Sequence, residues 1–351
     1  MTIHTDFWGG NIVVERVEGD TVYLERDLRD TEGDWFYWAF CIEGAAGRTL
    51  SFRFSSEARV GRFGAAVSHD LAAWHWSESG SGSSFSYTFA EDENKVYFAH
   101  HMLYHTERFG ELCRRGNFVP EVFCRTERGR ELPAVRIGEG DRWILMTARH
   151  HACESTGSYV LEGALDVLME KLPAEYSVLV VPFIDYDGVI DGDQGKNRKP
   201  HDHNGDYIDA PVYEVVRRLI AFAEMHDLCY FFDFHSPWHM GSQNDRVFFS
   251  HSTEAMKPFV CAFGEYLKAE TAGCEMKYTG AWDVGPNELW NNEKRLNSKN
   301  YFSRLDSVRL SVTMETPYFG VTDGTGKVSG EALRELGHAF GRSIIRYLNE
   351  H

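Results

Sequence analysis

Two patterns of hydrophobic and polar residues divide the chain. Within residues 21–104, segments such as 50–54 (LSFRF) and 85–89 (FSYTF) alternate apolar and polar side chains, and the aromatic run 35–42 suits a buried strand. The stretch 77–84 (SESGSGSS) has the composition of a turn-rich loop. Because no helical period of useful length interrupts these segments, an antiparallel β-sandwich of about 100 residues is predicted here.

After about Leu112 the pattern changes to alternating strands and helices. Strands are predicted at 143–149, 176–184, 229–234 and 308–313, and helices within 161–172, 212–222 and 333–348. Asp209 is placed to cap the second of these helices. Such alternation predicts an α/β sheet with helices on both faces, so we expect one domain over residues 1–111 and a second over 112–351. Ligands on this architecture bind at the carboxyl ends of strands.

Composition and charge exclude several classes of protein. The 36 Lys and Arg against 53 Asp and Glu give a net charge of −17, and no Lys/Arg run exceeds two residues, so we expect no nucleic-acid partner. The first residues resemble no secretory signal, and no stretch of about 18 apolar residues occurs, which predicts a cytoplasmic protein without a membrane partner. The seven cysteines form no CxxC pair, so reduced thiols are expected rather than a cysteine zinc site.

Candidate metal ligands follow two of the predicted strands. His151 and Glu154 stand three residues apart directly after the strand that ends at Arg149, and His235 immediately follows the strand 229–234. Two imidazoles and one carboxylate form the donor set of a catalytic zinc site that leaves one position open. His150 competes with His151 for this role, but its partner at the same spacing is Cys153, which gives a softer and rarer set.

Two further residues are candidates for catalysis. Glu315 lies at the end of the strand 308–313, where a carboxylate aimed at the same cleft can take a proton from water and return it to a leaving amine. The loop 185–209 is too long and polar for a simple connection, and its spacing does not fit a calcium loop, so an active-site loop is predicted. Within it, Arg198 can polarise a carbonyl, or it can be a solvated cation among the loop's seven aspartates.

These segments, in this order, resemble the zinc carboxypeptidase family of carboxypeptidase A. The string ARHHACESTGSYVLEGALDVL at 148–168 is similar to the zinc-binding segment of its cytosolic carboxypeptidase branch. The strings DWFYWAF, TLSFRF and KVYFAHHMLY are similar to the β-sandwich that precedes the catalytic domain there. The resemblance covers most of the chain and implies a carboxypeptidase-like fold with a mixed central sheet. It also implies one zinc ion per chain held by His151, Glu154 and His235, with Glu315 as general base and Arg198 as the carbonyl-polarising arginine.

The chain departs from this family at the substrate-binding string. The family's Asp-x-Asn-Arg, which binds the substrate's C-terminal carboxylate, maps onto residues 202–205, where Asn204 is retained and Gly205 replaces the arginine. Glycine offers no cation for a bidentate pair. Either Lys196, Lys199 or a more distant cation substitutes, or the substrate is not held by an α-carboxylate. Tyr301 lies in a stretch that suits the family's substrate-capping tyrosine.

The expected function is that of a zinc-dependent metallocarboxypeptidase that hydrolyses amide bonds at peptide C-termini or of isopeptide-linked amino acids. A zinc-dependent deacylase of N-acyl amino acids is the first alternative, because it uses the same metal set and base. The second is a catalytically inactive binding protein in which tryptophans such as Trp74 and Trp76 stack on sugars. We therefore expect a peptide or N-acyl amino acid as the substrate.

Overall fold

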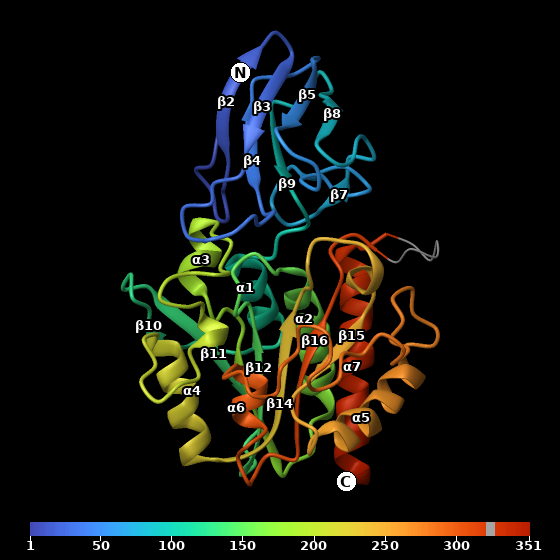
Figure 1. Ribbon diagram of the computed structural model, residues 1–351. Coiled ribbons are helices and arrows are strands. Elements are labelled where there is room, and N and C mark those ends of the chain that lie inside the picture. The colour runs from blue at the N-terminus through green and yellow to red at the C-terminus, as the bar shows by residue number, and fades with distance from the viewer. Residues whose placement is uncertain (321–326) are drawn as a thin grey trace.

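The computed structural model describes residues 1–320 and 327–351. Figure 1 shows two parts, with the N-terminal strands above and a larger sheet with helices below. Within the described residues, no helix is both long enough and apolar enough to cross a membrane.

The N-terminal part contains two sheets. The five-stranded sheet has the order β1 (Thr2–His4), β4 (Ala39–Glu43), β9 (Lys95–Ala99), β6 (Ala66–Ser68) and β7 (His75–Trp76). The four-stranded sheet has the order β2 (Val13–Glu18), β3 (Thr21–Glu25), β5 (Thr49–Phe54) and β8 (Ser84–Thr88).

The alternating pattern of these strands places one face of each sheet in a shared core. Along β5, Leu50, Phe52 and Phe54 are buried while the residues between them are not. They join a hydrophobic cluster with Trp38 from the loop before β4 and Phe98 from β9. Side chains from both sheets thus exclude water together, as period-2 strands with one apolar face require.

Two expectations for this part were wrong in detail. The sheets are not antiparallel throughout, because β3 pairs with β5 in parallel register. The aromatic run 35–42 is a strand only from Ala39, and the preceding aromatic residues form a buried connection. Apolar side chains indicate that a segment is buried, but a loop between two packed parts is buried as well, so the aromatic run did not by itself identify a strand.

The lower part is built on one mixed seven-stranded sheet. Its order is β10 (Glu121–Arg125), β11 (Glu131–Ile137), β13 (Tyr176–Val181), β12 (Arg142–Ala148), β14 (Asp227–His235), β16 (Leu310–Glu315) and β15 (Phe248–His251). The four central strands, β13, β12, β14 and β16, are parallel, and the outer pairs are antiparallel. The central strands are the four that the sequence predicted, because strands buried on both faces are continuously apolar.

The helices pack in two groups. One group is α2 (Thr156–Lys171), α5 (Lys257–Glu270) and α7 (Gly330–Glu350), in which α7 contacts both of the others. The other helices that contact the sheet are α4 (Glu214–Met225), against β10 and β14, and the short α6 (Ser298–Phe302), against β14 and β16. The close approach of α2 and α7 depends on glycine, because a Cβ at Gly163 would lie 2.1 Å from the carbonyl oxygen of Arg334.

Two further expectations need correction. Tyr213, not Asp209, occupies the N-cap position of α4. The loop 185–209 is not irregular throughout, since it contains α3 (Tyr186–Asp191) and a 3₁₀ turn, η1 (His203–Gly205).

Helix α1 (Thr106–Arg115) runs across the expected boundary between residues 111 and 112. Its buried residues Phe109, Leu112 and Cys113 belong to the core of the lower part. The division into domains 1–111 and 112–351 stays a prediction.

The register of the parallel strands decides where the candidate site residues meet. Ala148 at the end of β12 is level with Phe234 on β14, and His235 is level with Glu315 on β16. All three strands therefore deliver their last residues to one edge of the sheet.

Candidate metal centre

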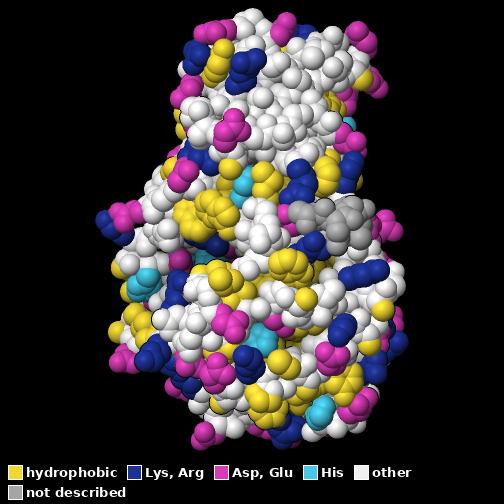
Figure 2. Space-filling model, turned by 45° about the vertical axis from the view of Figure 1, so that its right-hand side comes forward, with side chains coloured by type: hydrophobic (Ala, Val, Ile, Leu, Met, Phe, Trp, Pro, Cys, Tyr) yellow, Lys and Arg dark blue, Asp and Glu magenta, His cyan; other side chains and the backbone are white. Residues whose placement is uncertain are grey.

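A cavity of about 360 Å³ opens at this edge of the sheet. Its walls come from the ends of β12, β14 and β16, from the loop after α3 and from the segment that leads into α6. They include the expected residues His151, Glu154, Asn204, His235 and Glu315, and also Trp35, Lys196, Asp202, Trp238, Trp290, Asn291, Arg295 and Lys299. Figure 2 shows hydrophobic side chains gathered around a hollow below the N-terminal sheets, with Lys and Arg side chains among them.

His151, Glu154 and His235 lie close enough to bind one ion. Nδ1 of His151 is 3.0 Å from Oε1 of Glu154, and Nδ1 of His235 is 2.8 Å from Oε2 of the same carboxylate. One potential ligand atom from each residue lies within 4.8 Å of the others. Among the described residues, Nδ1 of His151 is buried without a hydrogen-bond partner, as expected of an atom that faces a cation. The donor set fits zinc, which prefers imidazole nitrogen and carboxylate oxygen.

A tight turn between β12 and α2 presents the first two of these side chains. Arg149 adopts a positive φ of 63° at the start of the turn. Its buried guanidinium donates to the carbonyl oxygens of Ala152 at 2.8 Å and of Tyr104 at 2.9 Å, so it closes the turn and fastens it to the segment before α1. On the following helix, a Cβ at Gly157 would lie 2.9 Å from the carbonyl carbon of Phe234. This glycine therefore lets the turn approach the end of β14.

Asp233 orients the second histidine. Its Oδ2 lies 2.9 Å from Nε2 of His235 and accepts a hydrogen bond from Ser298 at 2.7 Å, while Oδ1 accepts from Thr147 at 2.7 Å. Burial opposes ionisation of Asp233, but the imidazoles of His150 and His235 outweigh it and hold the pKa of this carboxyl well below its usual range. An ionised Asp233 keeps the proton of His235 on Nε2 and leaves Nδ1 free to bind a metal. The strand pattern gave no sign of this role.

His150 does not belong to the open donor set. Its Nδ1 lies 2.9 Å from Asp233, and its Nε2 lies 2.8 Å from the hydroxyl of Tyr207. His150, Asp233 and His235 also form a compact cluster, but both ring nitrogens of His150 are already engaged there. The structure thus favours His151 as the ligand at this turn.

Glu315 enters the same cavity from the end of β16. It is buried, and its Oε2 has no hydrogen-bond partner among the described residues. Burial raises the pKa of the Glu315 carboxyl to about 7. A buried carboxyl that is not tied to a structural partner can exchange protons near neutral pH.

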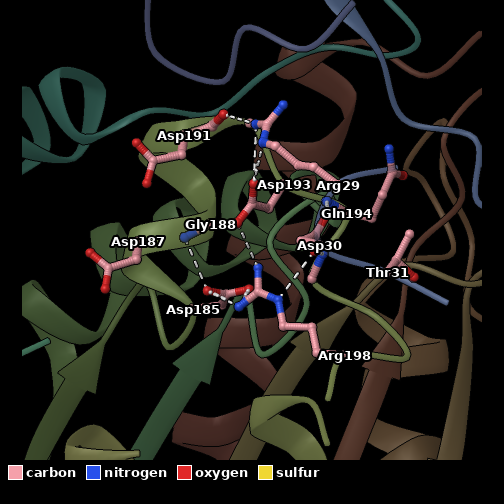
Figure 3. A network of polar contacts seen from close by, with 12 residues as sticks. Arg29, Asp30, Thr31, Asp185, Asp187, Gly188, Asp191, Asp193, Gln194 and Arg198 are labelled. Atoms are coloured by element: carbon pink, nitrogen blue, oxygen red, sulfur yellow. Dashed lines mark hydrogen bonds and ion pairs between the residues drawn. The ribbon is translucent and has the colours of Figure 1, made fainter. Parts of the chain in front are cut away.

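Arg198 lies outside the cavity. Figure 3 shows its guanidinium among aspartates, where Nε is 3.1 Å from Asp30, Nη1 is 2.9 Å from Asp185 and Nη2 is 3.0 Å from Asp193. The carboxylates raise the pKa of this guanidinium despite its burial. All three nitrogens that could polarise a carbonyl contact carboxylates instead, so the expected catalytic role does not fit this placement. Arg198 fastens the loop after β13 to the N-terminal segment that carries Asp30.

The two remaining candidates are placed differently. Asn204 lines the cavity, and its Oδ1 accepts hydrogen bonds from the backbone and hydroxyl of Ser298 at 3.2 and 3.0 Å. Tyr301 instead lines a separate depression with Tyr207 and Leu305. The structure brings Asn204, but not Tyr301, to the metal centre.

The cavity also contains cations that could replace the absent arginine. Nζ of Lys196 lies 2.5 Å from Oε1 of Glu154 and 4.7 Å from the centre of the Trp35 ring. Arg295 and Lys299 also line the cavity. Arg295 lies in the segment before α6, and Lys299 lies within this helix. Lys199 is exposed and pairs with Glu32 at 2.5 Å, outside the cavity.

Comparison with solved structures gives close matches over the whole chain. A metallo-carboxypeptidase from Burkholderia cenocepacia superposes with a TM-score of 0.83 at 19% identity and covers 99% of both chains. A metallo-carboxypeptidase from Pseudomonas aeruginosa, solved in complex with (2-guanidinoethylmercapto)succinic acid, gives 0.81 at 20% identity over 100% of both. The chain therefore has a carboxypeptidase-like fold. Both superpositions include the N-terminal sheets as well as the sheet that carries the candidate metal centre.

Sequence relatives of this carboxypeptidase-like chain agree with the fold. Cytosolic carboxypeptidase 1 of Gallus gallus is 22% identical over 320 residues, which cover 75% of this chain and 25% of that protein. An uncharacterised protein of Zymomonas mobilis is 27% identical over 183 residues, or 49% of this chain and 48% of that one. The chain thus spans about half of the Zymomonas protein and a quarter of the Gallus enzyme. No family model matches the chain.

Proposed function

We propose that this chain is a zinc-dependent metallocarboxypeptidase that hydrolyses amide bonds at peptide C-termini or of isopeptide-linked amino acids. One observation carries the proposal: His151, Glu154 and His235 share a cavity with the buried, unpartnered carboxylate of Glu315. Three protein ligands and a separate base are the minimum for metal-assisted amide hydrolysis.

The residues divide the chemistry among them. A zinc ion at His151, Glu154 and His235 would supply Lewis acidity toward a carbonyl and toward water. Glu315 takes a proton from the attacking water and delivers it to the departing amine, a task that suits a carboxyl with a pKa of about 7.

Two cavity residues hold the substrate in this proposal. Lys196, which contacts Glu154, takes the carbonyl-polarising role that was expected of Arg198. Asn204 supplies a polar side chain next to the scissile bond, in keeping with its position in the cavity wall.

The wider assignments belong to the same proposal. The paired N-terminal sheets would be the β-sandwich module that precedes the catalytic domain in the cytosolic branch. A cytoplasmic location is consistent with the seven cysteines, which are all free.

Replacing Glu315 with Gln tests the mechanism. The variant should bind zinc as the parent does but lose hydrolysis of a peptide with a free C-terminus by at least about 100-fold, because the proton acceptor is gone. Glu335→Gln, on the exposed face of α7, is the matched control and should keep full activity. Full activity in zinc-loaded Glu315→Gln would remove Glu315 from the mechanism.

A deacylase of N-acyl amino acids is the second candidate, because Gly205 leaves the family's carboxylate-binding arginine absent. Comparing peptides with N-acyl amino acids, each with and without a zinc chelator, separates the two activities. A zinc-loaded parent that cleaves neither class would instead indicate the inactive binding protein.

A further inference from the structure

Among the described residues, two cations in the cavity wall contact no carboxylate directly, although Glu315 acts on Lys299 and Asp202 interacts with Arg295 from a greater distance. Within the described residues, neither Lys299 nor Arg295 forms an ion pair, although both line the cavity. Two other cations near the site have carboxylate partners: Lys196 contacts Glu154, and Arg198 contacts three aspartates. In a chain with a net charge of −17, unpaired cations at this place call for an explanation.

The structure holds Lys299 in a fixed position. Its backbone carbonyl accepts a hydrogen bond from Ser311 on β16 at 2.7 Å, and its side chain is buried. The ammonium donates to Oδ1 of Asn291 at 3.1 Å. The amide nitrogen of Asn291 in turn donates to the carbonyl oxygens of His251 and Gly285, which turns the amide oxygen toward Lys299.

This ammonium is incompletely satisfied. It carries three N–H donors, and Asn291 accepts one of them. Glu315 and, more weakly, Asp233 act on this ammonium only from a distance, since neither forms an ion pair with it among the described residues. A buried charge without a paired partner is costly, and the cost falls when an anion binds beside it. Burial also lowers the pKa of Lys299 to about 8, so the group is still mainly charged at neutral pH.

We propose that Lys299, assisted by Arg295, is the receptor for a carboxylate on the substrate residue that departs as the amine. This inference rests on the proposed function. In it, Lys299 supplies the cation that is missing at position 205, where the chain has glycine. The carboxylate is either the α-carboxylate of a C-terminal residue or the side-chain carboxylate of an acidic one; both present the same group to an ammonium and a guanidinium.

Crowding does not account for the glycine at position 205. A Cβ there would lie 3.5 Å from Cβ of His201 and 3.6 Å from Oδ1 of Asp202, which are ordinary contacts. Position 205 therefore has room for a side chain, and in this proposal the cations at Arg295 and Lys299 supply the charge that Gly205 lacks.

Four small probes test the receptor: N-acetylglutamate, N-acetylglutamine, N-acetylglutamate α-amide and N-acetylglutamine α-amide. Binding is measured by calorimetry on the zinc-loaded protein and repeated on the metal-free protein, where no metal can bind a carboxylate. A receptor for the α-carboxylate should prefer the first two probes at least tenfold over the diamide, and a receptor for the side-chain carboxylate should prefer the first and third.

Variants of Lys299 and Arg295 test whether these two residues cause the preference for carboxylate probes. Lys299→Met should abolish the preference for carboxylate probes, and Arg295→Met should reduce it. Lys199→Met, which removes an exposed lysine outside the cavity, should leave it unchanged. Should Lys299→Met fail to fold, Arg295→Met still decides, because the Arg295 side chain lies at the surface.

Equal binding of all four probes to the parent, or an unchanged preference in both cavity variants, would overturn the proposal. The binding assay involves no turnover, so it separates the receptor from the hydrolysis. Lys299-dependent binding in a zinc-loaded protein that cleaves no amide would support the receptor and contradict the proposed function.

Discussion

The placement of Arg198 leads to a prediction that separates a structural role from a catalytic one. Replacing it with Met removes the cation that three carboxylates share and leaves Asp185 and Asp193 buried without it (Figure 3). The side chains of these two aspartates are 0% and 1% exposed, and that of Arg198 is 12% exposed, so solvent screens the contacts only weakly. The expected effect is therefore that of breaking a buried pair.

Removing one partner of such a pair costs about 3–5 kcal/mol. At about 2 °C per kcal/mol for a chain of this length, the thermal midpoint should fall by about 6–10 °C. Arg128→Met is the matched control, because its side chain is 54% exposed where it contacts Asp193, and it should cost about 1 kcal/mol or less. Urea denaturation of the parent and both variants provides the measurement.

Activity measured well below the thermal midpoint completes the test. Arg198→Met should keep kcat within about tenfold of the parent, whereas loss of a donor that stabilises the reacting carbonyl costs about 100- to 1000-fold. A variant as stable as the parent with kcat lowered 100-fold would refute the structural role and restore the catalytic one.

The same variant has a predicted pH dependence. Burial raises the pKa of Asp193 to about 6, and it would rise further without Arg198. Burial acts in the same direction on Asp185, but Arg198 and His203 outweigh it and hold the pKa of that carboxyl below its usual value. The folded variant can therefore relieve part of the cost of burying these carboxylates by taking up protons. Its stability deficit should be largest at neutral pH and should narrow as the pH falls through 6, and a deficit independent of pH would contradict this account.

Two other changes have defined outcomes. Asp233→Asn should weaken zinc binding by about 10- to 100-fold in a chelator competition, because the amide no longer fixes the proton of His235 on Nε2; unchanged affinity would remove Asp233 from the site. Gly163→Ala should destabilise the chain by about 1–3 kcal/mol or more in urea, since its Cβ would collide with the carbonyl of Arg334. Gly205→Ala, whose Cβ would make only ordinary contacts, serves as the control and should change stability by less than about 0.5 kcal/mol.

The sequence predicted the elements whose signals are local. The central strands β12, β13, β14 and β16 are continuously apolar, and α7 repeats its apolar residues at helical spacing, so both were found. The outer strands β10, β11 and β15 and the helices α1 and α5 were missed. Position at a strand end was enough to select His151, Glu154, His235 and Glu315 as site residues.

The environment of each charged side chain could not be predicted in this way. Arg198 and Lys196 are two positions apart in the same loop, yet one is enclosed by aspartates and the other contacts Glu154 in the cavity. Lys299 resembles any helical lysine until the chain folds it against β16. Which carboxylate lies beside a cation depends on segments that are distant in sequence, such as Asp30 beside Arg198.

The chain by itself thus determined the central strands, the main helices α2, α4 and α7 and the residues that end the central strands, because the periodicity of buried residues is a local signal. Only the tertiary structure decided which ionisable groups meet and which remain unpaired. Electrostatic pairing depends on distances of a few ångströms between residues far apart in the chain, and those distances exist only once both N-terminal sheets and the mixed sheet have packed together.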